Sequence, residues 1–243
     1  MSDLTTPPAR AFGDGTFSRV TGVVYHHVVV GALLCVATLP SAALLLLLDR
    51  SAASLPIVPL CLVPYGPALS AALYALRDRT LDPDSTTSPA PARSFVRGYR
   101  SNALDVMRLW VSAMVGLALV AFGVVHREAA GLPGGYVAVL GVIGAVGLLW
   151  LLNAVTIASF FSFRTRDAVR LAAYYLMRTP GVTVGLVALG VIALAVVRFS
   201  SELVLWLFAV AWVASWLRLG APLVRDVAER FTAPDDGHRQ RSA

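Results

Sequence analysis

The sequence predicts an all-α, polytopic membrane protein with six transmembrane helices in three hairpins and with interfacial helices on the cytoplasmic side. Composition supports this class, because 57% of the 243 residues are hydrophobic and only 14% are charged. A transmembrane helix needs about 20 mostly apolar residues, and the chain has six stretches close to that length. The expected spans are Tyr25–Leu48, Leu55–Leu76, Leu109–Val125, Val137–Phe160, Val182–Val197 and Leu203–Leu219.

The arginines fall almost entirely on one side of these spans. All 20 basic residues are arginine. Only Arg50, Arg127 and Arg198 lie on the other side of the expected spans, one in each loop there. Arginine-rich short loops stay in the cytoplasm, so both termini are expected there. The formal net charge of +6 then describes a cytoplasmic surface attracted to anionic lipid headgroups, and nucleic acid is not expected as a partner.

The first span has a second interpretation, a cleavable signal peptide, because small residues near Ala37 and Ala42 resemble a cleavage site. Its apolar run continues through Leu44–Leu48, beyond a normal signal core, so we expect an anchor that remains. The expected domains are a cytoplasmic N-terminal tail (1–22), a six-helix membrane domain (23–231, with the cytoplasmic loop 77–108) and a disordered cytoplasmic tail (232–243).

The second span contains the run Pro64-Tyr-Gly-Pro67. Two prolines bracketing a glycine remove backbone donors and predict a kinked or unwound helix at mid-membrane depth. Such breaks are tolerated where protein or a cavity satisfies the freed carbonyls. A plain proline kink is the alternative to a binding site. The candidate ligand-binding residues are Tyr65, Gly66 and Ser70, together with Asn153 of the fourth span.

Asn153, Thr156 and Ser159 follow one another at three-residue steps in the fourth span, and therefore share one face of a helix. They predict either a polar groove toward the cytoplasm or interhelical hydrogen bonds, which are worth about 1 kcal/mol each.

An amphipathic segment precedes the third span. Phe95, Tyr99, Leu104 and Met107 recur near helical spacing with arginines between them, which predicts a helix lying on the membrane surface before it turns into the span. Similar interfacial helices are expected after the fourth and sixth spans. An Arg-Asp pair follows each inward-running span, which is consistent with a weak internal repeat or with generic interfacial charge pairing: Arg77-Asp78, Arg166-Asp167 and Arg225-Asp226.

Residues for ion pumping, metal binding or nucleophilic catalysis are not apparent. The centre of every expected span is free of Asp, Glu and Arg, which argues against a proton-coupled pump or a channel with a charged filter. His26 and His27 are adjacent, and neighbouring helical residues point about 100° apart, so they cannot easily bind one metal ion. Neither a cofactor nor a metal is expected, and the chain is interpreted as a non-enzyme.

A membrane enzyme acting on lipid-linked sugar is the weakest alternative. It would use Asp105 or Asp167 as its acid, but each has an arginine three residues away, so surface ion pairing accounts for both.

The Pro64–Tyr74 run, followed by Phe95-x3-Tyr99-x2-Asn102, resembles the YesL family of bacterial integral membrane proteins, over about Val20 to Phe231. The chain departs from the family's pattern at Ala103, where an aromatic residue is common. The resemblance implies the bacterial cytoplasmic membrane and a part in carbohydrate uptake, and it carries no catalytic residues across.

The leading hypothesis is an accessory or regulatory component of carbohydrate uptake that contacts sugar-importer subunits through its arginine-rich cytoplasmic face. The alternative is a small transporter for a neutral solute, with its site at the proline kink of the second span. The expected partner-binding residues are Phe95, Arg97, Tyr99, Arg100, Asn102, Arg166, Asp167, Arg225 and Asp226.

Overall fold

The computed structural model describes residues 16–49, 51–81, 90–161, 164–200 and 202–231. Within these ranges the secondary structure is entirely helical, which confirms the predicted all-α class. The expected disordered tail (232–243) lies outside the described residues, as does most of the N-terminal tail. The helices are α1 (Thr16–Leu47), η1 (Ala52–Ser54), α2 (Val58–Cys61), α3 (Tyr65–Leu81), α4 (Pro91–Val125), α5 (Gly135–Phe160), α6 (Thr165–Arg178), α7 (Pro180–Phe199), α8 (Glu202–Leu207) and α9 (Ala209–Phe231).

Four of these helices are long and apolar enough to cross a membrane: α1 from Val20 onward, α4, α5 and α7. They correspond to the first, third, fourth and fifth expected spans and indicate a membrane-embedded protein. The second and sixth expected spans are each divided, the second between α2 and α3 and the sixth between α8 and α9. That the chain crosses the membrane six times therefore remains a prediction.

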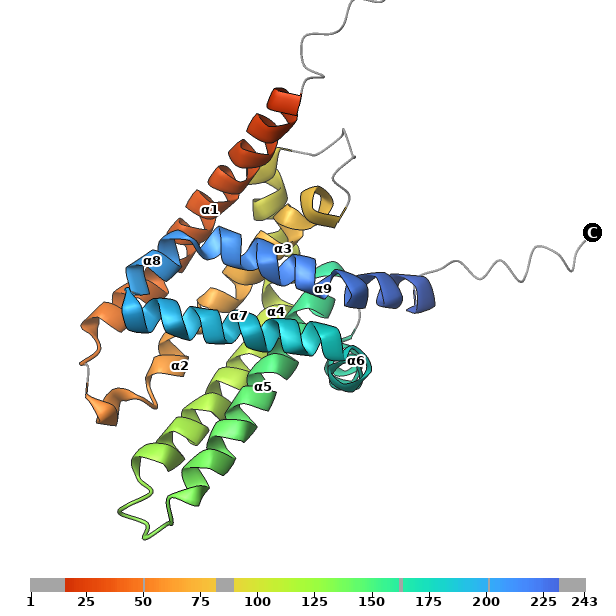
Figure 1. Cartoon of the computed structure of the whole chain (residues 1–243). Helices are drawn as coiled ribbons and strands as arrows, with labels where there is room; N and C mark the ends of the chain where they lie inside the picture. Colours follow the sequence, from red (N-terminus) through yellow and green to blue (C-terminus); the bar gives the residue numbers. More distant parts are fainter. Residues whose placement is uncertain (1–15, 50, 82–89, 162–163, 201, 232–243) are drawn as a thin grey trace, which may run out of the picture.

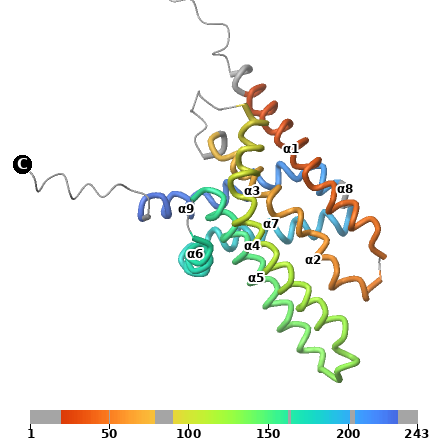
Figure 2. Tube along the Cα trace, turned by 180° about the vertical axis from the view of Figure 1, so that it is seen from behind, coloured from red at the N-terminus to blue at the C-terminus, as the bar shows by residue number. Residues whose placement is uncertain are grey.

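The helices do not form a bundle with parallel axes. In Figure 1, α4 and α5 form a long antiparallel hairpin, whereas α7 and α9 lie side by side and cross that hairpin at a steep angle. The view from behind in Figure 2 shows the same crossing. Each expected hairpin has its two members in contact, but the pair α7 and α9 runs in a different direction from α1 and from the α4–α5 hairpin (Figure 1).

Helix α3 lies at the centre of the fold, in contact with α1, α4, α5 and α9. Its buried face consists mostly of alanine, and small side chains let neighbouring helices approach closely. The buried apolar residues on this face are Ala68, Ala71, Ala72, Leu73, Ala75 and Leu76.

The predicted interruption of the second apolar stretch is confirmed. α2 ends at Cys61 and α3 begins at Tyr65, because Pro64 and Pro67 cannot donate to the preceding turn. The indole N–H of Trp110 in α4 donates to the carbonyl of Leu62 at 2.8 Å. The same carbonyl also accepts from the backbone N–H of Tyr65 at 3.0 Å, so the bond at the break chiefly satisfies the buried indole donor, as an apolar environment requires.

Gly66 makes room for that indole. A Cβ atom at position 66 would lie 2.5 Å from Cγ of Trp110, far inside van der Waals contact. The glycine between the two prolines thus serves close packing of α3 against α4.

The expected surface helix before the third span is corrected by the structure. α4 is one unbroken helix of 35 residues from Pro91 to Val125. Its N-terminal half packs along α3: Phe95 is only 5% exposed, and a Cβ atom on Gly98 would lie 2.7 Å from Cβ of Tyr74. Of the four residues in the predicted apolar stripe, Phe95 is buried and Met107 is half-buried, whereas Tyr99 and Leu104 are 39% and 76% exposed.

Replacing Gly66 with alanine should destabilise the protein by about 1–3 kcal/mol, because the added methyl group must displace Trp110 or shift α3. The measurement is thermal unfolding of the full chain in mild detergent. Gly116→Ala in α4 is the matched control, since a Cβ atom there meets nothing within 4 Å and alanine favours the helix by about 1 kcal/mol. Equal unfolding temperatures for the two variants would contradict the packing role of Gly66.

Candidate functional site

The candidate ligand residues of α3 are engaged within the protein. Ser70 Oγ lies 2.8 Å from Ser159 Oγ, and the Ser159 hydroxyl itself donates to the carbonyl of Val155 at 2.7 Å. Ser70 is therefore the donor in the bond between the two serines, and it ties α3 to α5. The space beside Gly66 is filled by the side chain of Trp110.

Asn153 is buried, with 1% of its surface exposed, and its Nδ2 atom has no hydrogen-bond partner among the described residues. Tyr65 is half-buried beside Thr38 of α1. Two surface hollows in the described part of the chain are lined by other residues. The solute site at Tyr65, Gly66, Ser70 and Asn153 thus stays a prediction, and neither of these two hollows is lined by its residues.

Asn102, expected to contact a partner, connects two helices of this protein. Its Nδ2 donates to the carbonyl of Ser159 at 3.0 Å, so α4 is tied to the same turn of α5 that holds Ser70. Ser159 therefore links α3, α4 and α5. Of the polar row in the fourth span, Ser159 forms interhelical hydrogen bonds, which is one of the two roles that the spacing allowed, whereas Thr156 donates to the carbonyl of Leu152 in its own helix.

Phe95 requires a similar correction. It was expected on the docking surface, but the helical period places it on the side of α4 that faces α3, where it is buried. Its neighbours Arg97 and Arg100 are exposed, and Tyr99 is 39% exposed.

A groove follows the exposed side of this part of α4. Arg93, Arg97 and Arg100 line it at spacings of four and three residues, and its volume is about 710 Å³. Such spacings place the three guanidinium groups on one helix face. Arg93 was absent from the expected docking set, although its position four residues before Arg97 could have identified it. The other described residues that line it are Ala92, Val96 and Ser101, all of them in α4.

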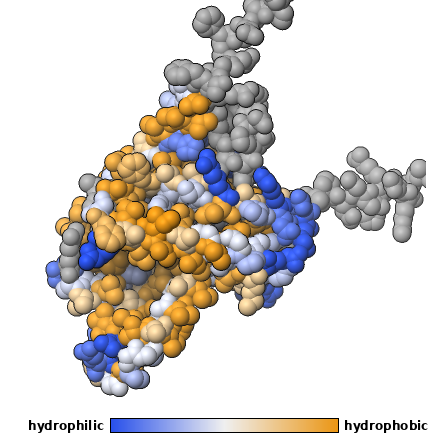
Figure 3. Space-filling model, viewed as in Figure 1, coloured by the Kyte–Doolittle hydropathy of each residue, from blue (hydrophilic) through white to orange (hydrophobic). Residues whose placement is uncertain are grey.

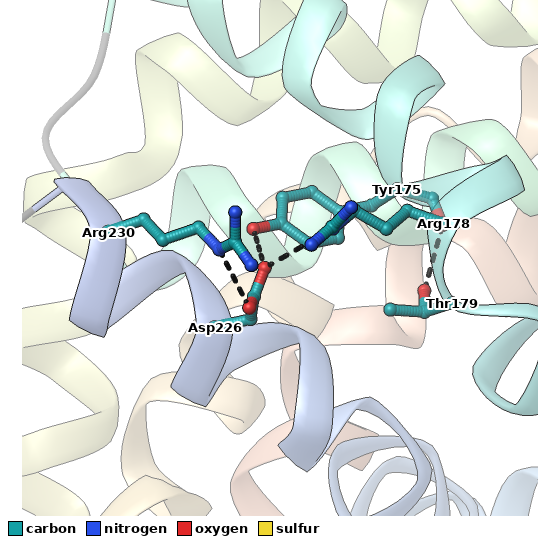
Figure 4. A network of polar contacts seen from close by, with 5 residues as sticks. All are labelled: Tyr175, Arg178, Thr179, Asp226 and Arg230. Atoms are coloured by element: carbon teal, nitrogen blue, oxygen red, sulfur yellow. Dashed lines mark hydrogen bonds and ion pairs between the residues drawn. The ribbon is translucent and has the colours of Figure 1, made fainter.

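Asp226 of α9 is held by side chains from α6 and from its own helix (Figure 4). The Tyr175 hydroxyl donates to Oδ2 at 2.5 Å, and Arg230 Nε donates to Oδ1 at 2.9 Å. Arg178 Nε lies 4.0 Å from Oδ2. Asp226 was expected to contact a partner, but its Oδ2 already connects α9 with α6, and its Oδ1 is bonded to Arg230 of α9 itself.

Neighbouring groups shift the pKa values of Tyr175, Asp226 and Arg230. Burial of the Tyr175 side chain, and then its hydrogen bond to Asp226, raise the pKa of that hydroxyl above its ordinary value of 10.0. The hydrogen bonds from Tyr175 and Arg230 lower the pKa of Asp226 below 3.8. The bond to Asp226 raises the pKa of Arg230. The network is thus stabilised with Asp226 ionised and Tyr175 neutral.

The remaining expected docking residues are Arg166, Asp167 and Arg225, and all three are exposed. They belong to α6 and α9, which lie together on one side of the molecule, whereas the start of α4 lies beside α1 and α3 (Figures 1 and 2). The nine expected residues therefore do not form one continuous face. The groove on α4 is the compact part of the set.

Hydrophilic residues gather at the far end of α9 and at the tip of the α4–α5 hairpin, with a broad hydrophobic surface between them (Figure 3). At the hairpin tip, Arg127 pairs with Glu128 at 2.9 Å, so its charge is compensated locally. Among the described residues, no group of three or more His, Cys, Asp or Glu side chains is arranged to hold a metal ion.

No known family model, curated protein or solved structure matches the chain. The geometry of the α4 groove and of the Tyr175–Asp226 network is therefore the structural basis for assigning a function.

The link between α6 and α9 should depend on pH at both extremes. The contribution of Asp226 is present above its ordinary pKa of 3.8 and is lost as the pH falls through the lowered value. The contribution of Tyr175 is present below 10.0 and is lost as the pH rises through the raised value.

We expect the unfolding temperature of the unmodified chain to exceed that of Tyr175→Phe by a constant amount between about pH 5 and pH 9. The difference should shrink in more acidic and in more alkaline solution. Thermal unfolding followed by circular dichroism at each pH provides the measurement. A difference that does not change with pH would show that the hydrogen bond to Asp226 contributes nothing.

Proposed function

We propose that this chain is a six-span protein of the bacterial cytoplasmic membrane, with both termini in the cytoplasm. Its function is to dock a protein partner on the cytoplasmic side, as a non-enzymatic accessory or regulatory component of carbohydrate uptake. The observation that carries the docking function is the row of three exposed arginines along the groove of α4. The connection with sugar importers rests on the resemblance to the YesL family.

The orientation is supported by the distribution of charge. Arg127 at the α4–α5 tip is one of only three arginines on the side opposite to the arginine-rich loops, and it is paired with Glu128. The helices between the two polar ends expose large apolar side chains, such as Leu119, Val142 and Leu194. An exposed apolar surface of this kind suits lipid contact.

The docking function is supported by the rigidity of the arginine row. Phe95 and Gly98 fix the opposite face of α4 against α3, so the guanidinium groups are held on a packed helix rather than on a loop. Binding sites on packed helices are more precisely placed than sites on loops. Arginine also suits recognition of carboxylates, because its planar fork can donate two parallel hydrogen bonds.

Affinity purification of the full chain from mild detergent should recover importer subunits. Reversing two charges of the groove with Arg97→Glu and Arg100→Glu should reduce that recovery at least about 10-fold, because two attractive contacts become repulsive. Recovery is measured by quantitative mass spectrometry of the bound fraction.

Asn102→Ala is the matched control on the same helix. It removes the bond to Ser159, so it should lower the unfolding temperature but leave recovery of the partner unchanged. Equal recovery by the charge-reversed variant and the unmodified chain would contradict docking through α4. The absence of importer subunits from every preparation would contradict the proposed part in carbohydrate uptake.

A further inference from the structure

We propose that the groove between α5 and α6 binds one anionic phospholipid of the cytoplasmic leaflet. An acyl chain would lie along α5, and the phosphate of the headgroup would bind Arg166 and Arg170 of α6. Partner docking on α4 plays no part in this binding, because the two surfaces lie on different helices. A built site for a single lipid is also more specific than the general attraction of a basic surface to anionic headgroups.

The groove has apolar walls from two helices and a volume of about 500 Å³. Val142, Ile143 and Val146 are exposed on the α5 side, and Ala173 and Met177 on the α6 side. None of its described lining residues is charged. Hydrocarbon covers such a surface favourably, whereas water does not.

Helix α6 lies at the cytoplasmic boundary of the proposed topology, because it joins the ends of two candidate membrane spans. α5 ends at Phe160 and α7 begins at Pro180, with α6 between them. Charged side chains gather in the same region, since Asp226 of α9 lies 4.0 Å from Arg178 Nε and 2.9 Å from Arg230 Nε. Lipid headgroups occupy this level of a bilayer.

The groove begins beside α6 and follows α5 away from that boundary. The indole N–H of Trp150 donates to the carbonyl of Val169 at 3.1 Å, so α6 crosses α5 near this residue. In Figures 1 and 2, α6 is seen nearly end-on, whereas α5 runs across the view. From Trp150 to Val142 the α5 wall measures about 12 Å along the helix axis. One leaflet contains about 15 Å of hydrocarbon, so the wall fits an acyl chain that descends from a headgroup at α6.

The shape of the groove selects an acyl chain over a helix of another protein. A membrane-spanning helix must cross about 30 Å of hydrocarbon, and a straight helix packed along this side of α5 would meet α6. A lipid chain ends at its headgroup, which can turn aside there. Two apolar surfaces also gain no hydrophobic free energy by leaving lipid for each other, so a protein segment has no such advantage over the lipid that it must displace.

Two arginines of α6 select an anionic headgroup. Arg170 lies three residues before Ala173 and seven before Met177, and Arg166 lies one turn before Arg170, so both are on the groove side of the helix. Both arginines are exposed, and neither takes part in an ion pair found within the described residues. The nearby acid, Asp167, points about 100° around the helix from Arg166. Guanidinium groups bind phosphate oxygens through charge-assisted hydrogen bonds, and basic pockets on the cytoplasmic side bind anionic headgroups.

Gly147 leaves open the space in the α5 wall that a chain would fill. A Cβ atom at this position would meet nothing within 4 Å, so a larger side chain there would enter the groove without disturbing helix packing. Leucine is also the better helix former. Gly141 of the same helix likewise has nothing within 4 Å of an added Cβ atom, and it is not among the described residues that line the groove.

The test uses the full chain in mild detergent, stripped of lipid and then titrated with phosphatidylglycerol or with phosphatidylcholine of the same acyl chains. Native mass spectrometry counts the lipids retained by each chain, and thermal unfolding reports the stabilisation that binding to the folded state produces. We expect one phosphatidylglycerol to be retained, with a Kd at least about 10-fold below that of phosphatidylcholine.

Two variants should change binding in different ways. Arg166→Gln with Arg170→Gln should raise the Kd for phosphatidylglycerol about 10-fold and remove the preference over phosphatidylcholine, because the guanidinium contacts are lost. Gly147→Leu should weaken binding of both lipids about 10-fold, because its side chain overlaps the acyl chain. A general folding defect could not produce both patterns.

Two matched controls should bind lipid as the unmodified chain does. Gly141→Leu adds the same side chain to α5 outside the groove. Arg218→Gln with Arg225→Gln removes two exposed arginines of α9 and changes the net charge by the same amount as the α6 variant.

The proposal is overturned if the unmodified chain retains both lipids equally, or if the α9 variant loses the preference as fully as the α6 variant. Equal binding by Gly147→Leu and Gly141→Leu would contradict a lipid in this groove. Inorganic phosphate that stabilises the chain as much as phosphatidylglycerol would contradict a site that needs an acyl chain. A dimer of this chain that Gly147→Leu disrupts would identify a protein as the occupant and also overturn the proposal.

Discussion

The packing of α4 against α3 determines where the charged residues of this protein lie. Phe95 is buried and Gly98 allows Tyr74 to approach closely, so the N-terminal half of α4 is attached to α3 over several turns. Because α3 is also in contact with α1, α5 and α9, α4 cannot bend onto a membrane surface without opening the core. A continuous helix of 35 residues is about 52 Å long, which exceeds the hydrocarbon core by about 22 Å.

Polar groups inside the fold serve its assembly. The buried indole of Trp110 donates to the carbonyl of Leu62 at the break before α3, and Ser159 joins Ser70 of α3 to Asn102 of α4. In an apolar environment each such bond replaces an unsatisfied group, which would cost several kcal/mol. These bonds use residues that would otherwise be available to a solute. The exposed side of α4 is therefore a better candidate for a functional site than the polar residues buried between the helices.

The sequence predicted the helices well because hydropathy and proline positions act locally. The interruption at Pro64–Pro67 follows from missing backbone donors. The environment of each helix face could not be predicted in this way. The spacing of Phe95 and Tyr99 fits both a lipid surface and a neighbouring helix, and only the packing of Gly98 on Tyr74 distinguishes them. Asp226 likewise reads as a surface charge until Tyr175, 51 residues away, is seen to donate to it.

Depth measurements along α4 test the central claim most directly. Spin labels at the exposed positions 97, 100, 104, 115, 119 and 122 of the chain in nanodiscs would report their accessibility to a water-soluble nickel chelate and to oxygen. A straight α4 predicts that aqueous accessibility falls stepwise from 97 to 100 to 104, and that positions 115, 119 and 122 are exposed to lipid. A common headgroup depth for positions 97, 100 and 104 would mean that the segment lies on the membrane surface. That result would contradict a straight α4 and the docking role built on it.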